Sequence, residues 1–248
     1  MTPGRRAWAR LLRRANALSP AQAVRSGGWL VIAPHPDDET LGAGGLIAAL
    51  AAAGGNLTVA FLTDGSGSHV GAPGWSERRV AGVRAREARA ALHQLGLDAA
   101  PLDLGWRDAA PFAPASPEFA ATVRRLVALC RRRGVRNIVT SWDADPHCDH
   151  AAAAALAQAT GRRLRIRPRY YAVWAWTLPD LDHRLRGMRA TAMPVERFRG
   201  EQRRALACHR TQLGGRIAGA ARRFVLPRSM RRLVDATHIL LLEPHHAS

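Results

Sequence analysis

Short apolar runs that alternate with longer helix-like segments constrain the fold of this chain more than any other feature. Runs rich in Val, Leu and Ile, each the length of a buried strand, occur at 29–33, 57–63, 137–141, 170–176 and 239–242. Segments with apolar residues at helical spacing occur at 41–53, 78–95, 117–133, 150–159 and 199–213. This alternation predicts one α/β domain with a Rossmann-like, mostly parallel sheet and helices on both faces.

The N-terminal segment differs from the rest because arginines surround an apolar stripe. Trp8, Leu11 and Leu12 follow helical spacing, which predicts a basic amphipathic helix over residues 1–20. The remaining chain, residues 25–248, is expected to form the main domain. Packing on that domain is the favoured role for the helix, and weak association with an anionic membrane surface is the alternative.

The sequence also bears on the compartment in which the protein works. No stretch approaches the ~18 uncharged apolar residues of a membrane-spanning helix. The N-terminal arginines interrupt the apolar core that a secretory signal requires. Cys130, Cys148 and Cys208 are an odd, widely spaced set, which argues against a disulfide framework and predicts a cytoplasmic location.

The charge balance first suggests a nucleic-acid partner. The formal net charge is +18, and all 37 basic residues are arginines because the chain contains no lysine. These arginines are spread along the chain in short groups, as in Arg131-Arg132-Arg133. A basic stripe is therefore not evident, and a nucleic-acid partner is not the expected one.

Residues 33–40 read Ala-Pro-His-Pro-Asp-Asp-Glu-Thr and stand between a predicted strand and a predicted helix. The carboxyl ends of parallel strands are where α/β proteins bind ligands. One imidazole and three carboxylates at such a point are costly to bury unless they are paired or coordinate a cation. Alone, the segment could equally be a turn in which Asp37 or Asp38 caps the next helix.

A second polar cluster, 142–150, also follows a strand and opens a helix. It contains His147 and His150, three residues apart, which can face one point on the first turn of a helix. The two clusters together supply His, carboxylate and His, a ligand set that suits Zn²⁺ and leaves a position for water. A bound Zn²⁺ lowers the pKa of water from 15.7 towards about 7, and the surplus carboxylates and imidazoles could move protons in a hydrolysis.

In combination the two motifs resemble the LmbE/PIG-L family of zinc deacetylases. This family includes N-acetylglucosaminyl-phosphatidylinositol deacetylases and the bacterial deacetylases of mycothiol and bacillithiol precursors. Weaker support comes from Leu62-Thr-Asp-Gly65, from the helix that carries Arg84 and Glu87, and from His209-Arg-Thr-Gln212. The resemblance implies hydrolysis of the N-acetyl group of an amino sugar or glycoconjugate, with one Zn²⁺ per chain held by His35, Asp38 and His150.

The resemblance also implies catalytic roles. Asp37 would be the general base for the zinc-bound water, and His147 would stabilise the oxyanion or protonate the leaving amine. Asp149 would hydrogen-bond His147 and fix its orientation, and Arg84 would contact substrate. Asp145 departs from the family pattern, because some relatives carry a tyrosine there that assists the oxyanion.

Two other functions compete with deacetylation. A metal-dependent phosphoesterase would also use Asp-rich clusters, often with two metal ions. A basic nucleic-acid-binding protein on a relic fold would explain the charge, but it would have little reason to retain the His and Asp set.

Overall fold

The computed structural model describes residues 3–244 and contains one main sheet. Its strands are β1 (Asn16–Ala17), β2 (Gly28–Ala33), β3 (Leu57–Thr63), β5 (Leu102–Trp106), β6 (Val135–Ser141), β7 (Arg169–Tyr171), β8 (Met188–Pro194) and β10 (His238–Pro244). They lie in the order β1-β8-β10-β7-β6-β2-β3-β5, and β10 runs antiparallel to both of its neighbours. A separate small sheet pairs β4 (His69–Val70) with β9 (Arg222–Arg223).

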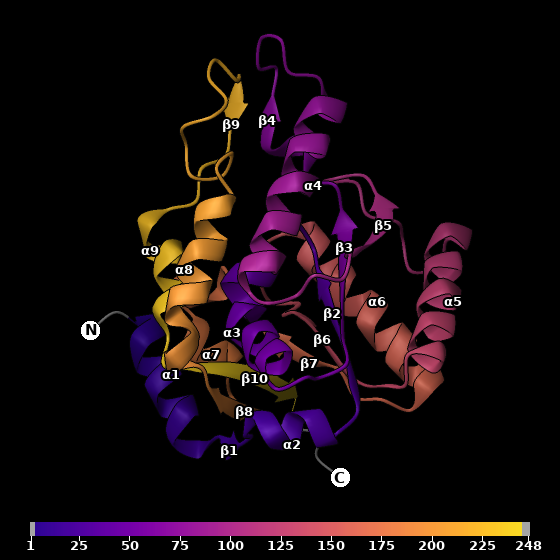
Figure 1. Ribbon diagram of the computed structural model, residues 1–248, viewed down its shortest axis with the longest axis vertical. Coiled ribbons are helices and arrows are strands. Elements are labelled where there is room, and N and C mark those ends of the chain that lie inside the picture. Colours follow the sequence, from indigo (N-terminus) through magenta and orange to yellow (C-terminus); the bar gives the residue numbers. More distant parts are fainter. Residues whose placement is uncertain (1–2, 245–248) are drawn as a thin grey trace.

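Helices cover both faces of the sheet, as predicted (Figure 1). The α-helices are α1 (Pro3–Arg14), α2 (Pro20–Arg25), α3 (Asp38–Ala52), α4 (Glu77–Gln94), α5 (Pro117–Arg132), α6 (Cys148–Leu164), α7 (Leu181–Arg184), α8 (Arg199–Cys208) and α9 (Arg228–Arg231). Short 3₁₀ turns form η1 (Ser66–Ser68), η2 (Ala175–Thr177), η3 (Glu196–Phe198) and η4 (Arg232–Asp235). The fold is therefore α/β with a mostly parallel sheet.

Strand β2 shows why its sequence is apolar without interruption. Trp29, Val31 and Ala33 point into the core beneath α3, α4 and α8, whereas Leu30 and Ile32 point into the core beneath α5 and α6. Both faces of a central parallel strand are covered, so each successive side chain must be apolar.

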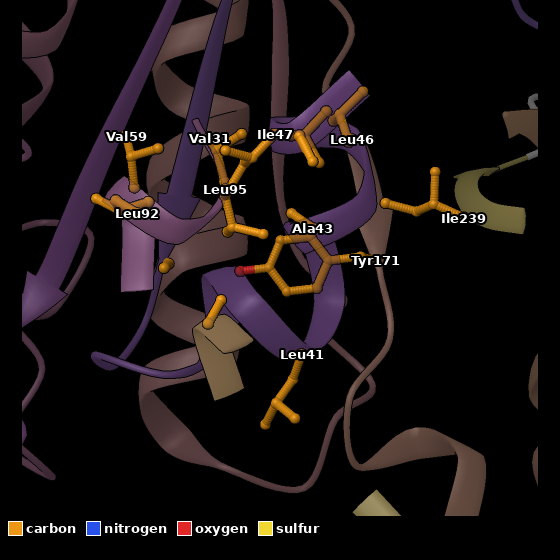
Figure 2. Packing of buried hydrophobic residues seen from close by; sticks show 14 of the residues in the cluster. Val31, Leu41, Ala43, Leu46, Ile47, Val59, Leu92, Leu95, Tyr171 and Ile239 are labelled. Atoms are coloured by element: carbon orange, nitrogen blue, oxygen red, sulfur yellow. The ribbon is translucent and has the colours of Figure 1, made fainter. Parts of the chain in front are cut away.

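Helix α3 lies deep in the first of these cores. Ile47 of α3 lies close to Val31 of β2, and the ring of Tyr171 lies against the same helix beside Ala43 (Figure 2). A Cβ atom at Gly42 would collide with that ring. The glycine therefore lets Tyr171 pack directly on the α3 backbone, close to the point where the first motif begins the helix.

The N-terminal segment is shorter than the predicted helix over residues 1–20. α1 ends at Arg14, and β1 then pairs in parallel with β8. Ser19 begins α2 through a capping box with Gln22. The apolar face of α1 packs on the domain, where Leu11 is buried beside α7 and β8. Within residues 3–244, no helix combines the length and apolar character needed to cross a bilayer.

Other predicted elements differ at their ends. Helix α6 continues past Gly161, where a Cβ atom would collide with the carbonyl oxygen of Ile166 as the chain turns back. The predicted strand 170–176 ends at Tyr171, and the helix predicted to reach Leu213 ends at Cys208. The sequence did not predict β5 or β8.

Candidate metal centre and active site

The two polar motifs follow β2 and β6, which are neighbours at the centre of the sheet. From β2 the chain moves through β3 towards β5 on one side, whereas β6 lies on the other side. Connections that diverge in this way leave a crevice at the carboxyl ends of the strands, and ligands bind there in α/β proteins. The topology thus brings together motifs that are about a hundred residues apart in the sequence.

Three predicted ligands meet at this edge of the sheet. Asp38 Oδ2 lies 3.0 Å from His35 Nδ1 and 3.2 Å from His150 Nε2. Asp38 begins α3 and His150 stands in the first turn of α6, so both side chains are fixed by regular backbone at the ends of buried strands. The ligand atoms of all three residues lie within 4.8 Å of one another.

Each imidazole of this set is also bonded to a second carboxylate. His35 Nε2 lies 3.0 Å from Asp149 Oδ2, and His150 Nδ1 lies 3.0 Å from Asp145 Oδ2. Each ring nitrogen of His35 and His150 therefore faces a carboxylate, which can only accept, and the pKa of both imidazoles is raised. A cation that displaced the protons between the rings and Asp38 would meet the lone pairs of His35 Nδ1 and His150 Nε2.

The residues fit a divalent cation. His150 Nε2 is buried and has no hydrogen-bond partner within the described residues, although it faces the Asp38 carboxylate. Burial opposes protonation of His150, but Asp38 and Asp145 outweigh it and raise its pKa to about 9. Lone pairs that face a carboxylate need a proton or a metal ion between them, and two imidazoles with one carboxylate match the ligands of Zn²⁺.

Asp145 is enclosed by donors. Its carboxylate accepts hydrogen bonds from the backbone N–H of Val173, at 2.9 Å, and of Ala175, at 2.6 Å, as well as from His150. Only 3% of the residue is exposed. Asp145 therefore orients a candidate metal ligand, and it is not placed to reach substrate as the tyrosine of some relatives is expected to do.

Asp37 and Arg84 form a buried pair beside the ligand set. Asp37 Oδ1 lies 3.3 Å from an Arg84 guanidinium nitrogen. Arg84 also donates to the carbonyl oxygens of Gly65, at 2.8 Å, and Pro36, at 2.7 Å. Burial raises the pKa of Asp37 to about 6, although Arg84 opposes this rise. Asp37 has a φ of 149°, a conformation that non-glycine residues rarely adopt.

Arg84 thus holds the loops that follow β2 and β3. A Cβ atom at Gly65, where φ is +67°, would collide with the Arg84 guanidinium, so this glycine permits the close approach. Arg84 is 3% exposed. Its contacts are with the protein, and the substrate contact predicted for it stays a prediction.

The expected hydrogen bond between the side chains of Asp149 and His147 is not formed. Asp149 Oδ2 lies 3.9 Å from His147 Nδ1 and accepts from His35 and from the backbone N–H of Ala109, at 2.9 Å. His147 Nδ1 instead accepts from the Asp149 backbone N–H, at 3.2 Å. The reason is the start of α6, which turns the Asp149 carboxylate inwards towards His35.

His147 keeps an accessible side chain, which is 36% exposed. Its ring stands edge-on to that of His35, with centroids 4.6 Å apart. Burial lowers the pKa of His147, and His35 and His150 lower it further. The neutral imidazole is therefore the form that the site favours.

Asp108 is a site residue that the sequence analysis missed. Its carboxylate lies 3.5 Å from His35 Nε2 and accepts from the Gly67 backbone N–H at 2.9 Å. Burial raises its pKa, but His35 outweighs this and the pKa falls to about 2. Asp108 follows β5, so recognition of that strand would have placed it at the same edge of the sheet.

The residues around His209, which gave weak support to the family resemblance, link α8 to the start of α3 beneath the site. His209 Nε2 lies 3.1 Å from Glu39 Oε1, and Glu39 also accepts the backbone N–H of Asp37 at 2.8 Å. Burial opposes protonation of His209, but Glu39 and Asp37 outweigh it and raise the pKa. Thr211 donates to Glu87 of α4. His69 of β4 is also buried, with 2% of its surface accessible, and burial together with the charge of Arg84 lowers its pKa.

Solved structures with the same fold come from several sources. The conserved protein TT1542 of Thermus thermophilus is 27% identical, with a TM-score of 0.58, over 76% of this chain and 81% of its own. The N,N'-diacetylchitobiose deacetylase of Pyrococcus horikoshii is 16% identical, with a TM-score of 0.64, over 100% and 97%. The 4-carboxy-2-hydroxymuconate hydratase GalB of Pseudomonas putida is 21% identical, with a TM-score of 0.58, over 84% and 82%.

A deacetylase and a hydratase with one fold show that the fold by itself does not select the reaction. No curated protein matches the sequence. The family model described as PIG-L, GlcNAc-PI de-N-acetylase, matches residues 30–160, a range that contains both polar motifs and more than half of the chain. The chain therefore belongs to the PIG-L family.

Proposed function

We propose that the protein is a zinc-dependent N-deacetylase that acts on an N-acetylated amino sugar or glycoconjugate. The observation that carries the proposal is the convergence of His35, Asp38 and His150, in which one nitrogen of each imidazole faces the same carboxylate. The PIG-L description supports amide hydrolysis. The name of the Pyrococcus deacetylase supports an N-acetylated sugar as the substrate class.

His35, Asp38 and His150 would hold one Zn²⁺, which supplies Lewis acidity towards water and the acetyl carbonyl. Asp37, next to Asp38 in sequence, would accept the proton that water loses as it attacks the carbonyl. A pKa near 6, raised by burial, leaves Asp37 mainly ionised at neutral pH and basic enough to take that proton.

His147 would donate a hydrogen bond to the oxygen on which negative charge develops. Its accessibility suits contact with substrate, and its neutral form has one N–H to donate. Asp149 would act through His35, whose ring it orients. Arg84 would keep Asp37 and the Gly65 loop in place, and any contact with substrate would follow a movement of that loop.

The alternatives are not favoured. A phosphoesterase or a nucleic-acid-binding role has no support from the family match, which describes an N-deacetylase. We further propose that residues 25–248 form the catalytic domain and that the protein works in the cytoplasm. Three free cysteines, Cys130, Cys148 and Cys208, support the latter.

Replacement of the base tests the proposal. Asp37→Asn should keep the Zn²⁺ content and lower acetate release from N-acetylglucosamine conjugates by about 10²- to 10⁴-fold, the usual contribution of a general base. Asp98→Asn is the matched control, because Asp98 is exposed and away from the site. Unchanged acetate release by the Asp37 variant would show that another group is the base.

A further inference from the structure

A surface cavity of about 620 Å³ lies between α1, α7 and the start of β8. Arg10 and Arg14 of α1 line one side, and Arg186 and Arg189 line the other. Asp182 is the single acidic residue among those that line the cavity. The cavity takes no part in the catalytic machinery, which is built from the motifs after β2 and β6.

The carboxylate of this cavity does not offset the charges of Arg14 and Arg186. Asp182 Oδ1 accepts a hydrogen bond from Arg10 at 2.9 Å, so this carboxylate is already paired. Arg14 and Arg186 are exposed and add positive charge that Asp182 does not offset. Guanidinium groups that line the same cavity repel one another, and an anion bound among them reduces that repulsion.

The floor of the cavity is apolar. Leu11, Leu185 and Ala190 are buried beneath the arginines, with exposures of 7%, 5% and 5%. These apolar side chains offer no hydrogen-bond acceptor to the arginines, so they do not compete with an anion for the guanidinium groups. The same packing occupies the apolar face of α1, so this helix cannot insert that face into a bilayer while it stays folded on the domain.

We propose that this cavity binds a phosphate group carried by a small polar molecule or by a phospholipid headgroup. Arginine forks bind phosphate oxygens in pairs, and a phosphate monoester carries close to two negative charges at neutral pH. A volume of about 620 Å³ also admits a glycerol- or sugar-sized group beside the phosphate. Binding at a membrane would then be electrostatic and would leave α1 in place.

The test compares two pairs of arginines at equal net charge. The variant Arg14→Gln/Arg186→Gln removes two cavity charges, and Arg131→Gln/Arg132→Gln removes two exposed charges at the end of α5, on the other side of the molecule (Figure 1). Glycerol 3-phosphate is titrated calorimetrically at low salt. The cavity variant should raise its Kd about tenfold or more, because charge-assisted hydrogen bonds are lost, whereas the control should change Kd less than twofold.

Sedimentation with phosphatidylcholine vesicles, with and without phosphatidylglycerol, identifies the source of the phosphate. Loss of binding to the anionic vesicles in the cavity variant alone identifies a headgroup. An effect on glycerol 3-phosphate without a vesicle preference identifies a soluble ligand. Equal effects of the two variants, or no binding by the wild type in either assay, would overturn the proposal. Unchanged thermal unfolding and acetate release confirm that the variants fold, since neither pair belongs to the active site.

Discussion

Replacement of Asp145 should affect both the stability of the fold and the affinity of the metal centre, and the two effects can be measured separately. In Asp145→Ala, three buried donors lose their acceptor: His150 Nδ1 and the backbone N–H groups of Val173 and Ala175. An unpaired buried donor costs about 1–3 kcal/mol. Loss of one member of a buried charged network typically destabilises by about 3–5 kcal/mol, a large part of the ~5–15 kcal/mol that keeps a domain folded.

Asp145→Asn is the sharper variant because it keeps the size of the side chain. The amide oxygen can still accept two of the three hydrogen bonds, and the amide nitrogen then faces the third N–H. We expect a loss of about 1–3 kcal/mol in the free energy of unfolding. His150 also loses its charged partner, and loss of such an outer partner lowers metal affinity by about 10- to 100-fold.

Urea unfolding of the metal-free protein measures the first effect, and competition with a chelator for Zn²⁺ measures the second. Asp143→Asn is the control, since Asp143 is an exposed carboxylate in the same loop. Wild-type zinc affinity in Asp145→Asn would refute the idea that this carboxylate sets the basicity and orientation of His150.

Three further predictions concern the loops and imidazoles around the centre. Gly65→Ala should lower stability in urea and acetate release, because its Cβ atom collides with Arg84. Gly54→Ala is the control, because Gly54 has a φ of +70° and no atom lies within 4 Å of a Cβ atom built there; it should show only the backbone cost of about 1 kcal/mol. Equal losses of stability in the two variants would contradict a collision at Gly65. Because the folded-state pKa of His209 is raised, its stabilising contribution is complete below the unfolded pKa of about 6.5 and is lost as pH rises through the folded pKa. The urea midpoint of the wild type should therefore fall as the pH rises through the folded-state pKa of His209. A His209→Gln variant whose midpoint falls equally with pH would show that His209 is not the group responsible. His147→Gln, which keeps an N–H donor, should retain more acetate release than His147→Ala, and equal activities would argue against a hydrogen-bonding role for His147.

The sequence predicted the centre of the fold and the meeting of the two motifs because the signals are local. The apolar run of β2 and the polar residues that follow it stand within about a dozen positions of each other. Strand β5 was missed because it is an edge strand with alternating exposure and a glycine at a φ of +76°. Asp108 was missed with it, since its place at the site depends on that strand.

Other features depend on segments that no local pattern connects. Asp145 was recognised only as a departure from the family, because its partners, Val173 and Ala175, come from the chain after β7. Asp149 was paired with His147 through the family resemblance, whereas its carboxylate lies 3.0 Å from His35 Nε2 and 3.9 Å from His147 Nδ1. The Asp149 carboxylate is directed by two partners from distant segments, His35 after β2 and the backbone N–H of Ala109 after β5.

The corrected partner of Asp149 bears on how the amide would be cleaved. His147 Nδ1 accepts a hydrogen bond from a backbone N–H, so the ring hydrogen lies on Nε2. Protonation at Nδ1 would set two donors against each other. Among residues 3–244 no carboxylate lies within hydrogen-bond distance of that nitrogen to offset the cost, and Asp149 Oδ2 is 3.9 Å away. His147 is therefore suited to donate a hydrogen bond to the oxyanion and poorly suited to carry a second proton to the leaving nitrogen. Asp37, with a pKa near 6, can both accept the proton from water and return it to the departing amine, so one carboxylate would serve both proton transfers.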